Sequence, residues 1–171
     1  NQAIALGAIS AGCRAYYAYP MTPSTSILKF IGDTYKETGI VVKQAENEIT
    51  AAQMAIGSMN MGTRAMVATS GGGFDLMSET ISCAGISETP LVLVLAQRGS
   101  AGTGVPTWTG AGDLSLAVNA GHGEFPRCVI SVSNPADAYL LTQIAFNIAE
   151  VYQLPVIILT EKQIAESIFN I

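Results

Sequence analysis

Charged residues are scarce in this sequence, and their scarcity narrows the kind of protein that it encodes. Only 12% of the 171 residues are charged, whereas 49% are hydrophobic. A typical soluble domain has roughly a quarter of its residues charged. No uninterrupted apolar run approaches the roughly 18 residues that a membrane-spanning helix needs. We therefore expect no membrane partner, and we expect the additional apolar surface to be covered by other protein.

Clusters of basic residues are also missing. The eight Lys and Arg residues are scattered singly against 13 Asp and Glu, and the net charge is −5. Proteins that bind nucleic acid neutralise phosphates with a basic patch or stripe. The sequence therefore argues against a nucleic-acid partner.

The cysteines are few and lack the spacing of a metal site. Cys13, Cys83 and Cys128 are isolated from one another and form no CxxC pair. This usage is typical of a reduced compartment, which points to the cytoplasm. It argues against a disulfide framework, and against an iron–sulfur cluster or other metal site held by this chain.

Helical periodicity alternates along the chain with short β-branched runs, which is the pattern of repeated βαβ units. We expect strands at 15–19, 40–44, 64–70, 90–97, 128–132 and 155–160, and helices at 1–13, 24–39, 47–62, 72–87, 113–119 and 135–153. Right-handed crossovers between such units produce a three-layer α/β/α fold with a mainly parallel sheet of about six strands. The length suits one domain. The chain starts without Met and ends on an apolar helical pattern, "IAESIFNI", so we expect it to be part of a longer polypeptide.

The loops that follow the strands of such a sheet are where ligands bind. The first of these loops, "AYPMTPSTS" at 18–26, holds Thr22 between Pro20 and Pro23. Each proline fixes one backbone angle, so the loop is stiff enough to present the Thr22 hydroxyl to the strand ends. Ser24 could instead serve only as the N-cap of the next helix.

The second loop leads into "QAENEITAAQMAIG", which carries two carboxylates at the start of a helix. The helix dipole favours carboxylates there, and that can be their whole role. Glu48, however, shares a helical face with Ala51, Ala52 and Ala55, so a flat ligand could come close to it. A carboxylate in such an apolar wall could share a proton with a heterocyclic nitrogen. We expect Glu46, which precedes the helix, to be solvated.

The third loop is "TSGGGF" at 69–74. It lacks the GK[ST] ending of a P-loop, so we expect its glycines to let the backbone press against a planar ring rather than to cradle phosphate.

The fourth loop begins with Arg98, which follows the most apolar strand and could bind a carboxylate bidentately. Its alternative is a structural ion pair, for which Asp113 is one candidate partner. His122, in "GHGEFP", is the single histidine, and we interpret it as a turn residue rather than a base.

Taken together, these loops resemble the α-subunit core of the 2-oxoacid:ferredoxin oxidoreductases, a thiamine-diphosphate-dependent family that includes pyruvate and 2-oxoglutarate synthases. The blocks that carry the resemblance cover nearly the whole chain: "AIALGAISAGCRAYYAYPMTPSTSI", "QAENEITAAQMAIG", "ATSGGGFDLM", "ETPLVLVLAQRGSAGTGVPT" and "GDL". The family often has Ile where this chain has Met21 and Pro where it has Gly72.

The resemblance implies a role for each residue of the loops. Residues 1–171 would form a pyrimidine-binding domain. Glu48 would hydrogen-bond N1′ of the aminopyrimidine and so activate the cofactor as the catalytic glutamate, with Ser70, Gly71 and Gly72 also in the cofactor site. Thr22 would contact the substrate, and Arg98 would hold its carboxylate. The family converts a 2-oxo acid and coenzyme A to acyl-CoA and carbon dioxide and passes electrons singly to ferredoxin.

Motifs that the family uses elsewhere are missing here. "GAGDLS" lacks the first acid and the downstream Asn of the GDG…N motif that holds the diphosphate through Mg²⁺, so that half of the site would lie on a β subunit. Iron–sulfur clusters would likewise lie on partner subunits or on fused domains. Two alternatives stay open: a subunit of a non-redox thiamine-diphosphate decarboxylase, and a non-catalytic assembly module. The 2-oxo acid is not determined by the sequence, and only the resemblance favours 2-oxoglutarate.

Overall fold

The computed structural model describes residues 1–170, and over these residues six strands form one parallel sheet. The strand order is β2-β1-β3-β4-β6-β5. The strands are β1 (Ala15–Ala18), β2 (Val41–Gln44), β3 (Ala65–Thr69), β4 (Leu91–Gln97), β5 (Cys128–Ser131) and β6 (Pro155–Glu161). The helices are α1 (Gln2–Ser10), α2 (Thr25–Thr38), α3 (Glu48–Asn60), α4 (Gly71–Leu76), α5 (Ser78–Ile86), α6 (Leu114–Val118), α7 (Pro135–Tyr152) and α8 (Lys162–Glu166). The expected α/β fold is confirmed.

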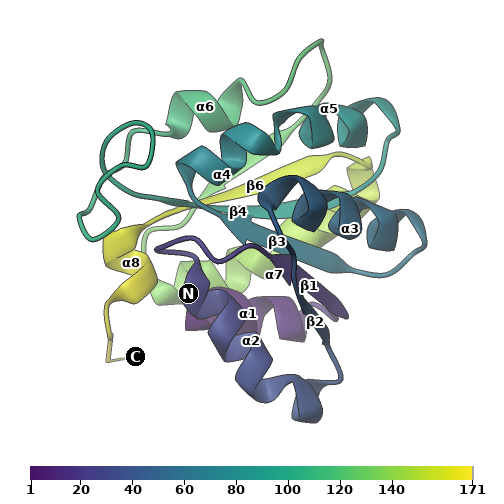
Figure 1. The fold of residues 1–171 in the computed structure, drawn as a ribbon. Helices are drawn as coiled ribbons and strands as arrows, with labels where there is room; N and C mark the ends of the chain where they lie inside the picture. Colours follow the sequence, from purple (N-terminus) through teal and green to yellow (C-terminus); the bar gives the residue numbers. More distant parts are fainter. Residues whose placement is uncertain (171) are drawn as a thin grey trace.

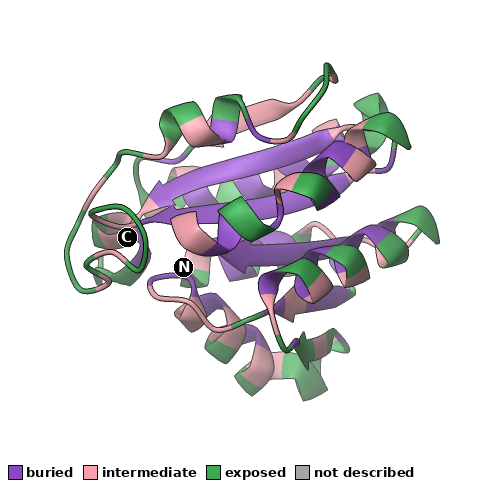
Figure 2. Cartoon of the chain, turned by 45° about the horizontal axis from the view of Figure 1, so that its top comes forward, coloured by how far each residue is buried: buried purple, intermediate pink, exposed green. Residues whose placement is uncertain are grey.

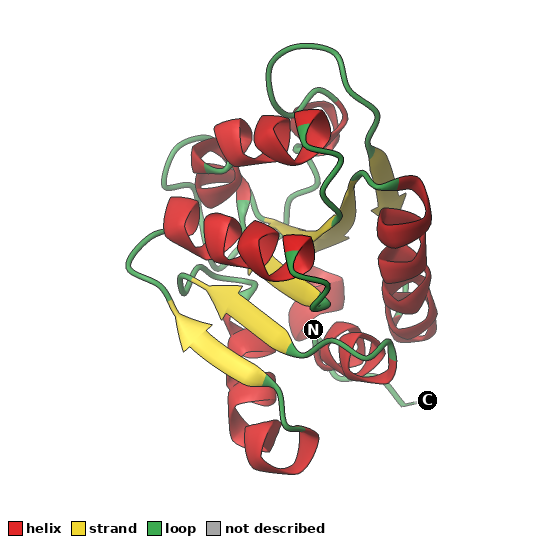
Figure 3. Ribbon diagram, turned by 90° about the vertical axis from the view of Figure 1, so that its right-hand side faces the viewer, coloured by secondary structure: helices red, strands yellow, loops and turns green. Residues whose placement is uncertain are grey.

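Helices cover both faces of the sheet, which makes three layers (Figures 1 and 3). Helices α1, α2 and α7 lie on one face, and α3 to α6 lie on the other. Alternate residues of each central strand point to opposite faces. Two separate apolar clusters result, one under each helical layer.

The central strands are buried on both faces, as Figure 2 shows. Every residue of β4 is buried, which confirms the interpretation of "LVLVLAQ" as an interior strand of a parallel sheet. The edge strand β2 is largely exposed. Within residues 1–170, no helix is both long and apolar enough to cross a bilayer.

One expected helix is divided in two. The apolar pattern over 72–87 predicted a continuous helix, but α4 ends at Leu76 and α5 begins at Ser78. At Met77 the backbone N–H bonds to the carbonyl of Phe74, three residues back, at 3.0 Å. This tighter turn separates the two segments. Met77 and Phe74 stay buried across the break, so the hydrophobic periodicity could not reveal it.

The strand order creates a topological switch point at the carboxyl ends of β1 and β3. The two strands are neighbours, with Tyr17 opposite Val67. The chain leaves β1 for α2 on one face and leaves β3 for α4 on the other face. Ligands of open α/β sheets bind at such switch points. The carboxyl ends lie at the left of Figure 1, beside the loop 98–113 and α8.

Candidate active site at the carboxyl ends of the strands

Glu48 opens α3 with its side chain inside the protein. Asn47 caps the helix, because its Oδ1 accepts a 2.9 Å hydrogen bond from the backbone N–H of Thr50. This cap turns the first helical residue toward the sheet. Glu48 is only 3% exposed, and within residues 1–170 its Oε1 has no hydrogen-bond partner. A buried carboxylate oxygen without a partner is costly, so such an atom marks a place where a ligand or a rearrangement can supply a donor.

The Glu48 carboxyl group packs against the backbone of α4 at Gly73. A Cβ placed on Gly73 would lie 2.6 Å from both Cγ and Oε1 of Glu48, and 2.0 Å from Oγ1 of Thr69. Any side chain at Gly73 would therefore collide with both residues. The sequence interpretation named Ser70, Gly71 and Gly72 but missed Gly73 and Thr69. The run of three glycines was the signal for a close approach, and the third glycine is the one pressed against the carboxylate.

The three residues named in the Gly-rich turn lie directly after β3, as expected. Ser70 is fully buried and, among residues 1–170, its Oγ has no hydrogen-bond partner. A Cβ on Gly71 would lie 3.1 Å from Oδ2 of Asp113, so that carboxylate occupies the space over Gly71. Gly72 is less crowded, since a Cβ there would meet the carbonyl oxygen of Gly102 at 3.6 Å. A proline at this position would therefore not collide as a side chain at Gly73 would.

Arg98 and Thr22 come together although they are far apart in sequence. Arg98 Nη1 donates a 2.8 Å hydrogen bond to the carbonyl of Thr22, and Nη2 donates to the carbonyl of Thr103. The carbonyl of Thr22, and not its hydroxyl, makes this contact. No salt bridge joins Arg98 to Asp113 in the described part of the chain, so the ion-pair alternative is wrong.

Asp113 is held by the strand end instead. Its backbone N–H donates a 2.8 Å hydrogen bond to Oε1 of Gln97, a buried residue at the end of β4. Burial, and then the negative charge of Asp75, raise the pKa of the Asp113 carboxyl above its ordinary value. The loop 98–112 is thereby anchored at both ends, at Arg98 and at Asp113.

The loop after β1 is held by its own contacts and by contacts to other segments, including the bond from Asn1 Nδ2 to the carbonyl of Pro23. The Ser24 hydroxyl donates to the carbonyl of Met21 at 2.6 Å. Ser24 thus occupies the N-cap position of α2 without forming a side-chain cap, and the capping interpretation is wrong for its hydroxyl. The sulfur of Met21 lies 3.8 Å from Oγ1 of Thr69. Met21 therefore contacts a residue that borders Glu48.

Two other residues lie where the sequence interpretation expected. Glu46 is exposed, and its Oε1 accepts from the Thr50 hydroxyl at 3.3 Å. His122 is exposed in a turn and lines a separate hollow of about 520 Å³ with residues of α5. None of the predicted site residues lines that hollow.

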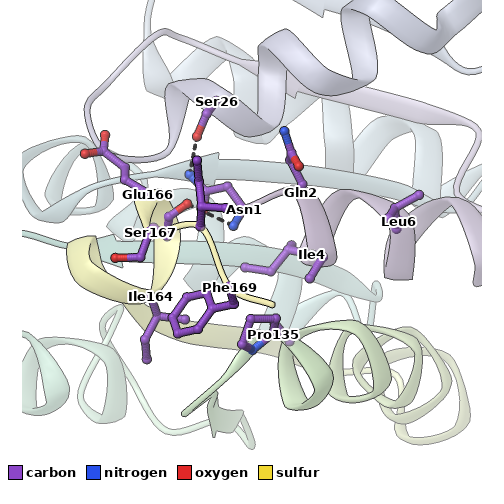
Figure 4. Close-up of a pocket in the computed structure, with 14 residues that line it drawn as sticks. Asn1, Gln2, Ile4, Leu6, Ser26, Pro135, Ile164, Glu166, Ser167 and Phe169 are labelled. Carbon is purple, nitrogen blue, oxygen red and sulfur yellow. Dashed lines mark hydrogen bonds between the residues drawn. The ribbon is translucent and has the colours of Figure 1, made fainter. Parts of the chain in front are cut away.

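A second hollow, of about 380 Å³, lies between α1, the start of α7 and the segment that follows α8 (Figure 4). Its walls are mostly apolar, and they include Ile4, Pro135 and Phe169. Glu166 is the single side chain in this lining that carries a charge. None of Thr22, Glu48, Ser70 and Arg98 borders it, so it is separate from the predicted site residues.

The carboxyl ends of the strands bring together a buried acid, a Gly-rich backbone segment and a guanidinium group. Over residues 1–170, no group of three or more His, Cys, Asp and Glu side chains is placed to hold a metal ion. Apolar side chains of the loop 98–113 reach into solvent, including Trp108, which is 70% exposed. The arrangement suits hydrogen bonding to a heterocycle and to a carboxylate, on a surface with apolar residues beside it.

Comparison with known proteins decides the family. Residues 6–171 match the model of the pyruvate flavodoxin/ferredoxin oxidoreductase, thiamine-diphosphate-binding family. The chain belongs to this family. The resemblance inferred from the loops is thereby confirmed.

Members of this oxidoreductase family are similar to the chain over most of its length. It is 43% identical to the 2-oxoacid:ferredoxin oxidoreductase 1, subunit alpha, of Sulfurisphaera tokodaii over 98% of this chain and 28% of the relative. It is also 43% identical to the 2-oxoglutarate synthase subunit KorA of Methanothermobacter marburgensis, over 95% of this chain and 43% of that protein. The chain thus spans less than half the length of either relative.

A solved structure of this oxidoreductase type has the same fold. It is the 2-oxoglutarate:ferredoxin oxidoreductase from Magnetococcus marinus, with 2-oxoglutarate, coenzyme A and succinyl-CoA bound. The TM-score is 0.93 at 41% identity, over 95% of this chain and 28% of that one. The likeness extends over nearly the whole chain, so it supports the α/β fold class independently of the loop motifs.

Proposed function

We propose that residues 1–171 form the pyrimidine-binding domain of a 2-oxoacid:ferredoxin oxidoreductase. The reaction would convert a 2-oxo acid and coenzyme A to acyl-CoA and carbon dioxide, with electrons passing to ferredoxin. The names of the relatives support this reaction type, and the solved relative was obtained with a 2-oxo acid, coenzyme A and the corresponding acyl-CoA bound. Thiamine diphosphate, when bound, supplies the nucleophile and the electron sink for loss of carbon dioxide.

The observation that carries the proposal is the state of the Glu48 carboxyl group. It is buried at the switch point of the sheet, and no Lys or Arg forms a salt bridge with it within residues 1–170. A carboxyl group in this position can hold a proton at N1′ of an aminopyrimidine ring. Ser70, with a buried hydroxyl that lacks a partner within residues 1–170, and the backbone of Gly71 and Gly72 would complete the cofactor site, where the Asp113 carboxylate lies over Gly71.

Arg98 and Thr22 would bind the 2-oxo acid. Arg98 directs one N–H to the Thr22 carbonyl and another to the Thr103 carbonyl, so its guanidinium keeps further donors for a substrate carboxylate. The bond to the Thr22 carbonyl places the two residues side by side. We favour 2-oxoglutarate as the substrate, because two of the relatives compared above are named for it.

The remaining machinery would belong to partners. A β subunit would hold the diphosphate and Mg²⁺, and iron–sulfur clusters would lie on further subunits or fused domains. The exposed Trp108, in the loop after β4, and Ile49, next to Glu48 in α3, fit a surface that such a partner covers. We expect the assembled complex to work in the cytoplasm.

The test is Glu48→Gln in the assembled enzyme. We expect a loss of roughly 100-fold or more in 2-oxo acid oxidation, because the amide cannot exchange the proton, while the fold and assembly are retained. Glu46→Gln is the matched control, since Glu46 is exposed just before the same helix, and it is expected to keep wild-type turnover. Unchanged turnover in Glu48→Gln would refute the assignment.

The same assay separates the alternatives. Oxidation that requires coenzyme A and a low-potential electron acceptor supports the oxidoreductase. Carbon dioxide release without either one would indicate a non-redox decarboxylase, and binding of partners without any turnover would indicate an assembly module.

A further inference from the structure

The Thr69 hydroxyl lies beside the Glu48 carboxylate, and the proposed function gives it no role. A Cβ on Gly73 would be 2.0 Å from Thr69 Oγ1 and 2.6 Å from Glu48 Oε1, so both oxygens border the same small space over Gly73. Thr69 ends β3 and is fully buried. A hydroxyl group and a carboxylate from two different elements therefore border one space, and no side chain separates them there.

The hydrogen bonds that Thr69 makes in this state are weak. Its hydroxyl is 3.4 Å from the carbonyl of Ser70 and 3.8 Å from the sulfur of Met21. The first distance is beyond the range of good O–H···O bonds, and a thioether is a weak acceptor. Glu48 Oε1, meanwhile, has no partner in residues 1–170. The weakly bonded donor and the unpartnered acceptor are thus neighbours.

We infer that Thr69 is a positioning residue for Glu48. A small rotation of the Thr69 side chain directs its hydroxyl to Oε1, in the space that Gly73 leaves open. A hydrogen bond to a carboxylate is stronger than one to a carbonyl or a thioether. With Oε1 held in this way, Oε2 is left to meet N1′ of the cofactor ring. This inference rests on the proposed role of Glu48 and adds the group that orients it.

The experiment compares two ligands in the assembled enzyme. One is thiamine diphosphate, and the other is its analogue in which ring atom N1′ is replaced by carbon. The dissociation constant of the analogue divided by that of thiamine diphosphate reports the Glu48–N1′ hydrogen bond. In Thr69→Val, which has the same shape but lacks the hydroxyl, we expect this ratio to fall about tenfold. In Thr69→Ser, which keeps the hydroxyl, we expect it to recover.

A purely structural role of Thr69 would weaken both ligands equally and leave the ratio unchanged, and that result would overturn the inference. Met21→Leu is the matched control, because it removes the sulfur contact alone and should keep the wild-type ratio. A loss in Met21→Leu as large as that in Thr69→Val would also overturn the inference. If Thr69→Val does not assemble, Thr69→Ala replaces it. A fall in the ratio then supports the inference, and an unchanged ratio overturns it.

Failure of the proposed function gives a different result. If the wild-type enzyme binds both ligands equally, Glu48 does not contact N1′ and the functional proposal itself is wrong. If the wild type discriminates and Thr69→Val discriminates equally well, the role of Glu48 stands and only the role of Thr69 is lost.

Discussion

Arg98 Nη1 donates a 2.8 Å hydrogen bond to the backbone carbonyl of Thr22, across 76 residues of chain. Its other terminal nitrogen, Nη2, donates to the carbonyl of Thr103. One guanidinium group therefore connects the loop after β1 with the loop after β4. The planar fork of arginine suits this arrangement, because its donors point in fixed and different directions.

Replacing Arg98 should separate substrate binding from cofactor binding. In Arg98→Ala we expect the affinity for the 2-oxo acid to fall roughly 10- to 100-fold, since a charge-assisted bond and the contact to Thr22 are lost together. The affinity for thiamine diphosphate should change much less. Titration of each ligand into the assembled enzyme measures both values, and a selective loss of cofactor affinity would contradict the assignment.

The Asn47 cap should matter for both stability and function. Asn47→Ala removes the acceptor for Thr50 N–H and should lower the free energy of unfolding by about 1 kcal/mol. It should also weaken thiamine diphosphate binding, because the first turn of α3 carries Glu48. Asn134→Ala is the matched control. Asn134 caps α7 by the same 2.9 Å bond, to Asp137 N–H, so it should show the stability loss without the binding loss. Equal effects on binding would show that the Asn47 cap does not position Glu48.

Gly73 should tolerate no side chain. In Gly73→Ala the added methyl group meets Thr69 and Glu48, and we expect a loss of about 1–3 kcal/mol in the free energy of unfolding together with loss of cofactor binding. Gly57→Ala, on an exposed position of α3 with nothing within 4 Å of its Cβ, should instead stabilise the fold by about 1 kcal/mol. Chemical denaturation of both variants checks the comparison. A stable Gly73→Ala protein that retains cofactor affinity would contradict the packing argument.

Asp113 should make stability fall as the pH rises. Because its pKa is raised in the folded state above the ordinary value of 3.8, the folded chain binds this proton more tightly than the unfolded chain does. The contribution is favourable at low pH and is lost as the pH rises from about 3.8 through the folded-state pKa. Asp113→Asn should therefore gain stability relative to the wild type over that interval. Thermal unfolding at several pH values measures the difference, and a constant difference at all pH values would contradict it.

The sequence by itself determined the layers of the fold. Alternating helical and strand periodicities, with buried runs such as 90–97, are local properties of the chain, and βαβ connections leave few arrangements open to them. Glu48, Thr22 and Arg98 could be named for a similar reason, because loops at the carboxyl ends of parallel strands converge on one edge. The break at Met77 could not be predicted, since the apolar pattern continues through it.

Only the tertiary structure decided which atoms meet at that edge. Whether Arg98 faces Asp113 or the carbonyls of Thr22 and Thr103 depends on the path of the loop 98–112, and no local pattern encodes that path. Glu48 lies against Gly73 and beside Thr69 because α3 and α4 pack on the same face of the sheet. Contacts between segments distant in sequence depend on packing distances of a few tenths of an ångström, and residue types and spacings do not carry that information.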